Sequence, residues 1–301
     1  MSRDISDILK GVSIVVIMLH HMSQTFSPPG LLAPYQSFGY LGVSIFIFLS
    51  GYGLSSSYLQ KKHLDHFLRK RVFRVYVPFF IVSLFYVILK FMFGSGMDLR
   101  DAFLVSSGIR LVSGSYWFVI FIMIAYIFFY FSFKKFEPKN ALLSVTLLIS
   151  LYWITCLLLG LGKWWYTTSF AFPLGILFAI YKDVLIPHIF QRRFMYLTGI
   201  IIALGISTVV ALAPFPLFPS IGKTFSSTTF VLLIVFISIF ANIHSKILKL
   251  IGVYAYEIYL SHVVLIVFLR DFNSIEHVAI FLLLVAVTAF GLHKITARIK
   301  F

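Results

Sequence analysis

Long, nearly uninterrupted apolar runs are the feature that most constrains how this chain can fold. They recur along all 301 residues, and each has about the 20 residues that a helix needs to cross the hydrocarbon core of a bilayer. A membrane β-barrel would instead alternate apolar and polar residues over segments of about 10. Only 12% of the residues are charged, against about 25% in soluble domains. The sequence therefore predicts an all-α, polytopic membrane helical bundle.

Counting these runs gives about ten transmembrane helices. The loops between them are too short to hold an extramembrane domain, so we expect one integral membrane domain over residues 1–301. Any chemistry must then take place within the bundle or at its edge. The predicted spans are 7–26, 38–58, 72–93, 115–133, 140–159, 166–181, 194–213, 224–243, 247–269 and 275–293.

Lysine and arginine are distributed unevenly between alternate loops. With the N-terminus inside, nineteen of the 25 fall in inside segments, as the positive-inside rule requires. Both ends are therefore predicted to be cytoplasmic. The same pattern explains the formal net charge of +15 without nucleic acid, because no continuous basic surface that could follow phosphates is apparent. The six outside residues are Lys90, Arg100, Arg110, Lys163, Lys223 and Arg270.

Polar residues inside the first span are candidates for function, because burying them in a membrane is costly. Lys10 and His21 are 11 residues apart, which is close to three whole turns, so both lie on one helix face. The helical rise places His21 about 16 Å deeper than Lys10, near the middle of the bilayer. His20 points about 100° away. The alternative is a histidine pair that only bonds to neighbouring helices.

The second span carries the segment Phe46 to Leu54, in which Ser50 lies 11 residues before Lys61. Ser50 is therefore also about 16 Å from the inner surface. Gly51 and Gly53 would permit close helix approach or a local kink. Packing alone explains this segment equally well.

A basic cluster at Arg69, Arg71 and Arg74 begins the third span. Arg71 and Arg74 share a helix face, and planar guanidinium groups suit phosphate. The cluster is equally consistent with a topology signal that attracts anionic lipid headgroups.

The ninth span carries Glu257 and His262, and His262 is 13 residues past Lys249. This places His262 at nearly the depth of His21. An intramembrane carboxylate needs a partner, so Glu257 is either functional or paired with a cation from another helix. Near the fourth span, the aromatic residues around Trp117 are explained by an interfacial belt. The single cysteine, Cys156, excludes an intramolecular disulfide and a cysteine-built metal site.

In their order along the chain, these segments resemble the membrane acyltransferase family 3, a family of bacterial acyl-CoA-dependent O-acyltransferases. Lys10 and His21 match the basic residue and histidine of the family's first span, and Phe46 to Tyr52 match its Phe-Phe-x-Leu-Ser-Gly-Tyr type segment. The other matching parts are Arg71, Arg74 and Pro78, then Trp117 with Phe118, and the closing segment Gly252 to His262.

The resemblance implies a function for each part of this pattern. An acyl group, acetyl in the first place, would move from cytoplasmic acyl-CoA to a hydroxyl of a cell-surface saccharide, which could be lipid-linked. The expected location is the bacterial inner membrane, with membrane lipids as further partners and no metal. The resemblance implies that His21 is the catalytic residue with Lys10 as its paired basic residue, and that Arg71 and Arg74 contact the CoA phosphates. Beside these, we expect His262 to take part in catalysis and Arg69 in CoA binding. The substrate-binding residues that we expect are Ser50, Tyr52, Trp117 and Glu257.

Two other functions compete with this interpretation. A proton-coupled transporter or flippase could use His21, Glu257 and His262 as a pathway for protons or a polar substrate. A sensory or scaffold protein could keep the pattern without activity. Only acyl transfer consumes the donor, so release of free CoA separates the enzyme from both alternatives.

Overall fold

The computed structural model describes residues 1–25, 32–93, 96–269 and 275–299. Across these ranges the regular secondary structure is helical and contains no β-strand, which confirms the predicted all-α class. Nine helices in the described part are long and apolar enough to cross a membrane. They become ten if the bent pair α11 (Lys246–Val253) and α12 (Ala255–Leu269) forms one span. Residue 26, Arg270 and Lys300, used in the predicted topology, lie outside the described residues.

The chain is arranged as two compact units, each made of three segments. Unit 1 contains Met1–Ile17, Phe38–Asp65 and Ile127–Gly252. Unit 2 contains Met18–Ser37, His66–Tyr126 and Val253–Phe301. The helices α1 (Arg3–Thr25) and α6 (Trp117–Lys135) contribute several turns to each unit, and α11 contributes its last residue, Val253, to unit 2.

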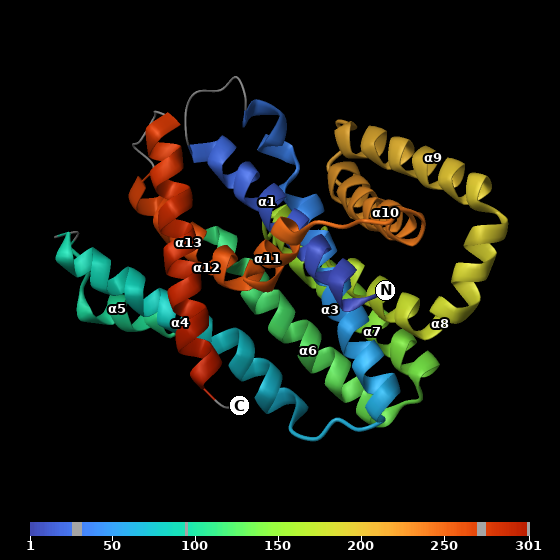
Figure 1. Cartoon of the computed structure of the whole chain (residues 1–301), viewed down its shortest axis with the longest axis horizontal. Coiled ribbons are helices and arrows are strands. Elements are labelled where there is room, and N and C mark those ends of the chain that lie inside the picture. The colour runs from blue at the N-terminus through green and yellow to red at the C-terminus, as the bar shows by residue number, and fades with distance from the viewer. Residues whose placement is uncertain (26–31, 94–95, 270–274, 300–301) are drawn as a thin grey trace. The chain divides into compact units, whose positions relative to one another are not determined.

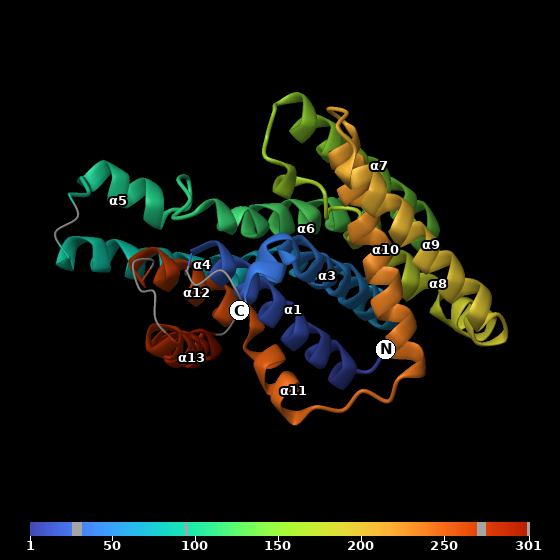
Figure 2. The same cartoon turned by 90° about the horizontal axis from the view of Figure 1, so that it is seen from above.

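Unit 1 holds two close helix pairs. Helices α9 (Arg193–Leu212) and α10 (Phe218–Phe240) run side by side (Figures 1 and 2). Helix α3 (Gly39–Lys61) packs on α8 (Ala171–Gln191), and a Cβ at Gly51 would lie only 2.2 Å from the Phe172 carbonyl oxygen. The predicted close approach is therefore present at Gly51, whereas Gly53 has no neighbouring atom within 4 Å. Helix α7 (Pro138–Leu158) completes the long helices of this unit.

Unit 2 is organised around α12, which tyrosines connect to its neighbours. The Tyr256 hydroxyl donates to the Val75 carbonyl oxygen of α4 (Phe67–Met92) at 2.7 Å. The Tyr116 hydroxyl, from the short helix η2 (Gly114–Tyr116), donates to the Leu260 carbonyl oxygen at 2.7 Å. These bonds fix α12 against α4 and η2. The unit also contains η1 (Ala33–Ser37), α5 (Leu99–Ser106) and α13 (Ile275–Arg298).

Two spans differ from their predicted form. The span predicted at 166–181 begins as a helix only at Ala171, because η3 (Lys163–Trp165) and turns precede it. The span predicted at 247–269 is broken at Tyr254, between α11 and α12. The break follows Gly252, and glycine costs about 1 kcal/mol in a helix interior relative to alanine. The apolar run does not reveal such a break, since both halves are apolar and only one residue separates them.

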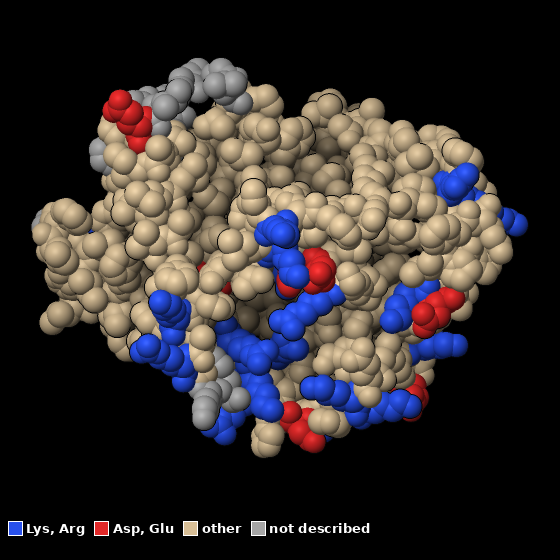
Figure 3. Space-filling model, viewed as in Figure 1, with Lys and Arg blue, Asp and Glu red and all other residues tan. Residues whose placement is uncertain are grey.

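The outside of the helices is apolar, as a bilayer requires. Large hydrophobic side chains are exposed on several spans, for example Leu158 and Leu212, each 80% exposed. Figure 3 shows a face on which residues other than Lys, Arg, Asp and Glu cover most of the surface. The multi-pass membrane interpretation agrees with this surface. Cys156 is buried and free.

Candidate active site

Two histidines that are far apart in the sequence meet in unit 2. The ring of His21, near the end of α1, lies 5.3 Å from the ring of His262 on α12, measured between centroids. The similar depths predicted for them agree with this contact. His262 is completely buried, and His21 is half-buried. The arrangement brings two groups capable of proton transfer to one place inside the membrane-spanning part of the chain.

His20 is held differently from its neighbour. Its Nδ1 donates to the Tyr35 carbonyl oxygen at 3.1 Å, because a carbonyl can only accept. Its Nε2 lies 3.3 Å from the amide nitrogen of Gln24, which must be the donor. Both ring nitrogens of His20 are thus engaged. Among the described residues, His21 has ring contacts with His20 and His262 but no hydrogen bond. The geometry therefore favours His21 as the reactive member of the pair.

The hydrogen bonding of His262 determines which of its nitrogens is available. Nδ1 lies 3.1 Å from the Ile258 carbonyl oxygen and must donate to it. In the neutral ring, Nε2 is then the acceptor. This Nε2 is buried and has no hydrogen-bond partner among the described residues. Buried polar atoms of this kind call for an explanation, and a substrate hydroxyl group would satisfy this one.

The ring of Tyr259 lies 5.8 Å from the ring of His262 on the same helix. Its hydroxyl donates to the Ser115 carbonyl oxygen, so Tyr259 is held from the η2 side. Tyr116, on the same segment, is fully buried. Together with the bond from Tyr256 to α4, this bond gives Tyr259 a structural role, because it orients the helix that carries His262. Sequence reasoning did not find this role.

Glu257 has a partner that sequence reasoning missed. Nδ1 of His293 on α13 lies 2.8 Å from Oε1 of Glu257. The pair connects α12 to α13, which agrees with the structural alternative for Glu257. A histidine inside the last apolar run was the available signal.

The predicted CoA-binding cluster occupies the first two turns of α4. Arg69 and Arg74 are exposed and Arg71 is half-buried. The guanidinium of Arg71 lies 6.0 Å from the centre of the Phe67 ring. No carboxylate in the described ranges forms an ion pair with these three arginines. Their charge is consequently available to an anionic ligand.

Three predicted site residues lie in unit 1 and are engaged there. Lys10 forms an ion pair with Asp7 at 2.9 Å, on a helix that continues without a break to His21. The Ser50 hydroxyl donates to the Phe46 carbonyl oxygen of its own helix at 2.9 Å. The Tyr52 hydroxyl accepts from the Met1 amino group at 3.0 Å. The roles assigned to Lys10, Ser50 and Tyr52 stay predictions.

Trp117 opens α6 in unit 2 and packs against the rings of Phe118 and Phe121. It is buried among protein side chains. Its assignment to substrate stays a prediction. Within the described ranges, no group of three or more His, Cys, Asp or Glu residues is arranged to hold a metal ion.

Comparison with known families gives one match. A family model described as an acyltransferase domain, that of the acyltransferase 3 family, matches residues 4–292. No curated protein and no solved structure matches the chain. The match includes α1, α4 and α12, which carry the histidines and the arginine cluster described above.

Proposed function

This chain belongs to the membrane acyltransferase family 3, and from that premise we propose that it moves an acyl group from acyl-CoA to a hydroxyl of a saccharide. The observation that carries the proposal is the contact between His21 and His262, whose rings are 5.3 Å apart. The buried Nε2 of His262 without a partner supports it. A thioester is already activated for acyl transfer, but a hydroxyl is a weak nucleophile. The reaction therefore needs a group that accepts the hydroxyl proton, and a histidine nitrogen can do this.

In the proposed reaction, His21 is the general base. The acceptor oxygen attacks the thioester carbonyl carbon while its proton passes to His21. A C–O bond forms, the C–S bond breaks, and the proton leaves with the sulfur as the free thiol of CoA. Nε2 of His262 would accept a hydrogen bond from a second hydroxyl of the saccharide and so orient it, because the attacking hydroxyl has a single proton and passes it to His21. Neither step requires a metal.

The donor is proposed to bind from the cytoplasmic side. The exposed guanidinium groups of Arg69 and Arg74, together with the half-buried one of Arg71, suit the phosphates of CoA. Arg71 precedes Val82 by 11 residues on α4, a helical rise of about 16 Å. The long, thin pantetheine arm could extend along this distance to bring the thioester toward the histidines.

The acceptor and the cellular location complete the proposal. Acetyl-CoA is the first donor to test, and the acceptor is a cell-surface or lipid-linked saccharide. The protein would lie in the bacterial inner membrane with both ends in the cytoplasm, as the charge distribution supports. Residues 1–301 would act together as one acyltransferase domain.

Purified protein in detergent tests this function. Labelled acetyl-CoA is added with and without saccharides extracted from the cell envelope, and free CoA and labelled saccharide are followed together. The proposal predicts saccharide-dependent release of CoA with matching label in the saccharide. Absence of both would contradict it and favour the transport alternative.

A further inference from the structure

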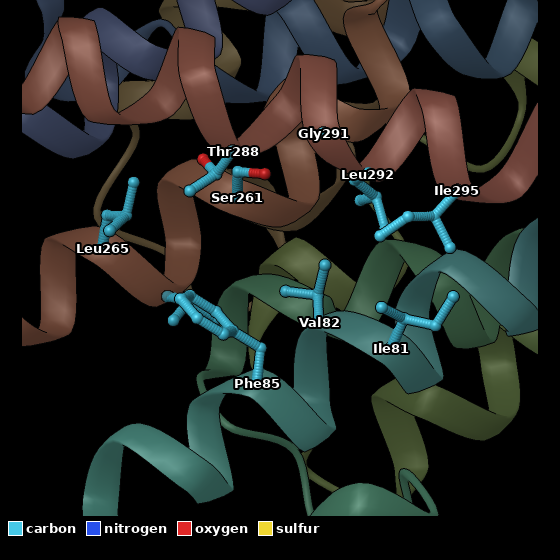
Figure 4. Close-up of a pocket in the computed structure, with 10 residues that line it drawn as sticks. Ile81, Val82, Phe85, Ser261, Leu265, Thr288, Gly291, Leu292 and Ile295 are labelled. Atoms are coloured by element: carbon cyan, nitrogen blue, oxygen red, sulfur yellow. The ribbon is translucent and has the colours of Figure 1, made fainter. Parts of the chain in front are cut away.

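A cavity in unit 2 lies between α4, α12 and α13, and the histidine contact does not use it (Figure 4). Its volume is about 210 Å³. Val82 and Phe85 form part of the α4 wall, and Ser261 lies on the opposite wall with Gly291 of α13. The complete lining is Ile81, Val82, Phe85, Ser261, Val264, Leu265, Thr288, Gly291, Leu292 and Ile295, so only two of its side chains carry a polar atom.

One of these two polar groups lacks a partner. Thr288 donates within α13 to the Leu284 carbonyl oxygen at 2.7 Å. The Ser261 hydroxyl is buried and has no hydrogen-bond partner in the described part of the chain. Ser261 itself is only 3% exposed. An unsatisfied buried hydroxyl in an apolar cavity indicates a ligand that is mostly hydrocarbon but carries one hydrogen-bonding group.

The volume of the cavity indicates how much hydrocarbon it can bury. An apolar cavity of about 150 Å³ holds benzene, which has six carbon atoms. By the same measure, 210 Å³ holds about eight carbons. The methyl group of an acetyl would leave most of this space empty. A chain of medium length fills it.

The position of the cavity indicates where such a chain comes from. Ser261 directly precedes His262, so their Cα atoms are about 3.8 Å apart, and the His262 ring lies beside that of His21. The α4 wall of the cavity is on the same helix as the arginine cluster. A thioester whose CoA phosphates lie at these arginines therefore has its acyl end at this depth.

We propose that this cavity binds the hydrocarbon part of a medium-length acyl group on the donor, with the Ser261 hydroxyl donating a hydrogen bond to the thioester carbonyl. The inference rests on the proposed function and defines its donor more closely. It extends the donors beyond acetyl-CoA to thioesters of up to about eight carbons. The same bonds form and break in the transfer step as with acetyl-CoA, since only the length of the acyl group differs.

Binding of two donors provides the first measurement, because it needs no acceptor. Each buried methylene strengthens binding roughly fourfold, so we expect octanoyl-CoA to bind the wild-type protein at least tenfold more tightly than acetyl-CoA. The same purified protein is then assayed for saccharide-dependent CoA release with each donor. Octanoyl-CoA is expected to support transfer.

Gly291→Leu is the sharpest variant for filling the cavity. A Cβ at Gly291 has no atom within 4 Å, so the new side chain extends into open space. We expect the octanoyl-to-acetyl ratio of affinities to fall at least tenfold. Gly205→Leu is the matched control, because Gly205 also has open space around its Cβ position but lies on α9 in unit 1. Its ratio should equal that of wild type.

A second variant, which enlarges the cavity, keeps the inference testable if Gly291→Leu does not fold. Val82→Ala enlarges the cavity and should shift the preferred donor from octanoyl-CoA toward decanoyl-CoA. If Gly291→Leu does not fold, absence of this shift overturns the inference.

The outcomes separate the two proposals. Acetyl transfer without tighter octanoyl binding, or a ratio unchanged by Gly291→Leu, overturns the acyl cavity but leaves acyl transfer intact. The cavity would then be a site for a bilayer lipid tail, which native mass spectrometry of the purified protein would detect. No CoA release with either donor contradicts the proposed function itself, even where octanoyl-CoA binds.

Discussion

Removing the contact between Glu257 and His293 tests whether this pair holds α12 against α13. Oε1 of Glu257 lies 2.8 Å from Nδ1 of His293, and the two side chains are 12% and 36% exposed, respectively. Glu257→Ala deletes the carboxylate and leaves Nδ1 of His293 without its partner. Glu257→Gln keeps an acceptor oxygen of similar reach. We therefore expect the alanine variant to lose stability and the glutamine variant to keep most of it.

The magnitude follows from the position of the pair. Polar contacts between helices inside a membrane contribute about 0.6 kcal/mol on average and at most about 1.7. Because His293 is about one-third exposed, solvent or lipid headgroups screen part of the interaction. We expect a coupling free energy of about 1 kcal/mol. The single Glu257→Ala change should cost about 1 kcal/mol as well, because Nδ1 of the partly exposed His293 can turn to solvent or headgroups once its partner is removed.

A double-mutant cycle measures the coupling. The free energies of unfolding of wild type, Glu257→Ala, His293→Ala and the double variant are compared in mixed detergent and SDS micelles. A lower stability of each single variant together with a double variant that costs about 1 kcal/mol less than their sum would agree with the structure. Additive effects would refute a direct interaction between the two side chains.

Three further predictions address topology, donor binding and packing. In intact cells, a cysteine at Asp65 should be shielded from a membrane-impermeant thiol reagent and one at Asp98 should react, whereas the reverse pattern would contradict the predicted orientation. Arg71→Ala should raise the KM for acyl-CoA about tenfold to a hundredfold, since a hydrogen bond to a charged group contributes about 1.5–3 kcal/mol; an unchanged KM, measured with saturating acceptor, would leave the cluster as a topology signal. Gly51→Leu should prevent purification of folded protein, because its Cβ position is 2.2 Å from a backbone oxygen. Gly53→Leu should be tolerated in the same size-exclusion assay, and equal behaviour of the two would contradict the α3–α8 packing.

Much of the fold follows from the sequence because lipid imposes a simple rule. Each predicted apolar run corresponds to a helix or a bent helix pair within the described residues. The rule concerns length and apolarity alone, so it could not place the break at Tyr254 between α11 and α12. It also missed α5, which has only eight residues. Tertiary packing determines these features.

The candidate site was partly predictable for a similar reason. Spacing along single helices gave His21 and His262 nearly the same depth, and their rings are in contact. Spacing along one helix could not predict how the helices are arranged beside one another. This arrangement determines which side chains meet. The pairing of Glu257 with His293 and the cavity beside Ser261 both depend on how α12 meets α13. The hydrogen bonds that hold His20 likewise required coordinates.

The central claim is that acyl transfer takes place at His21, and the comparison with its neighbour tests it most directly. Saccharide-dependent transfer from labelled acetyl-CoA is measured for wild type, His21→Ala and His20→Ala, with CoA binding as the control for folding. Loss of a general base typically costs about 10²- to 10⁴-fold in rate. The account predicts such a loss for His21→Ala with CoA binding retained, and substantial activity for His20→Ala. An active His21→Ala variant, with or without an inactive His20→Ala variant, would contradict it.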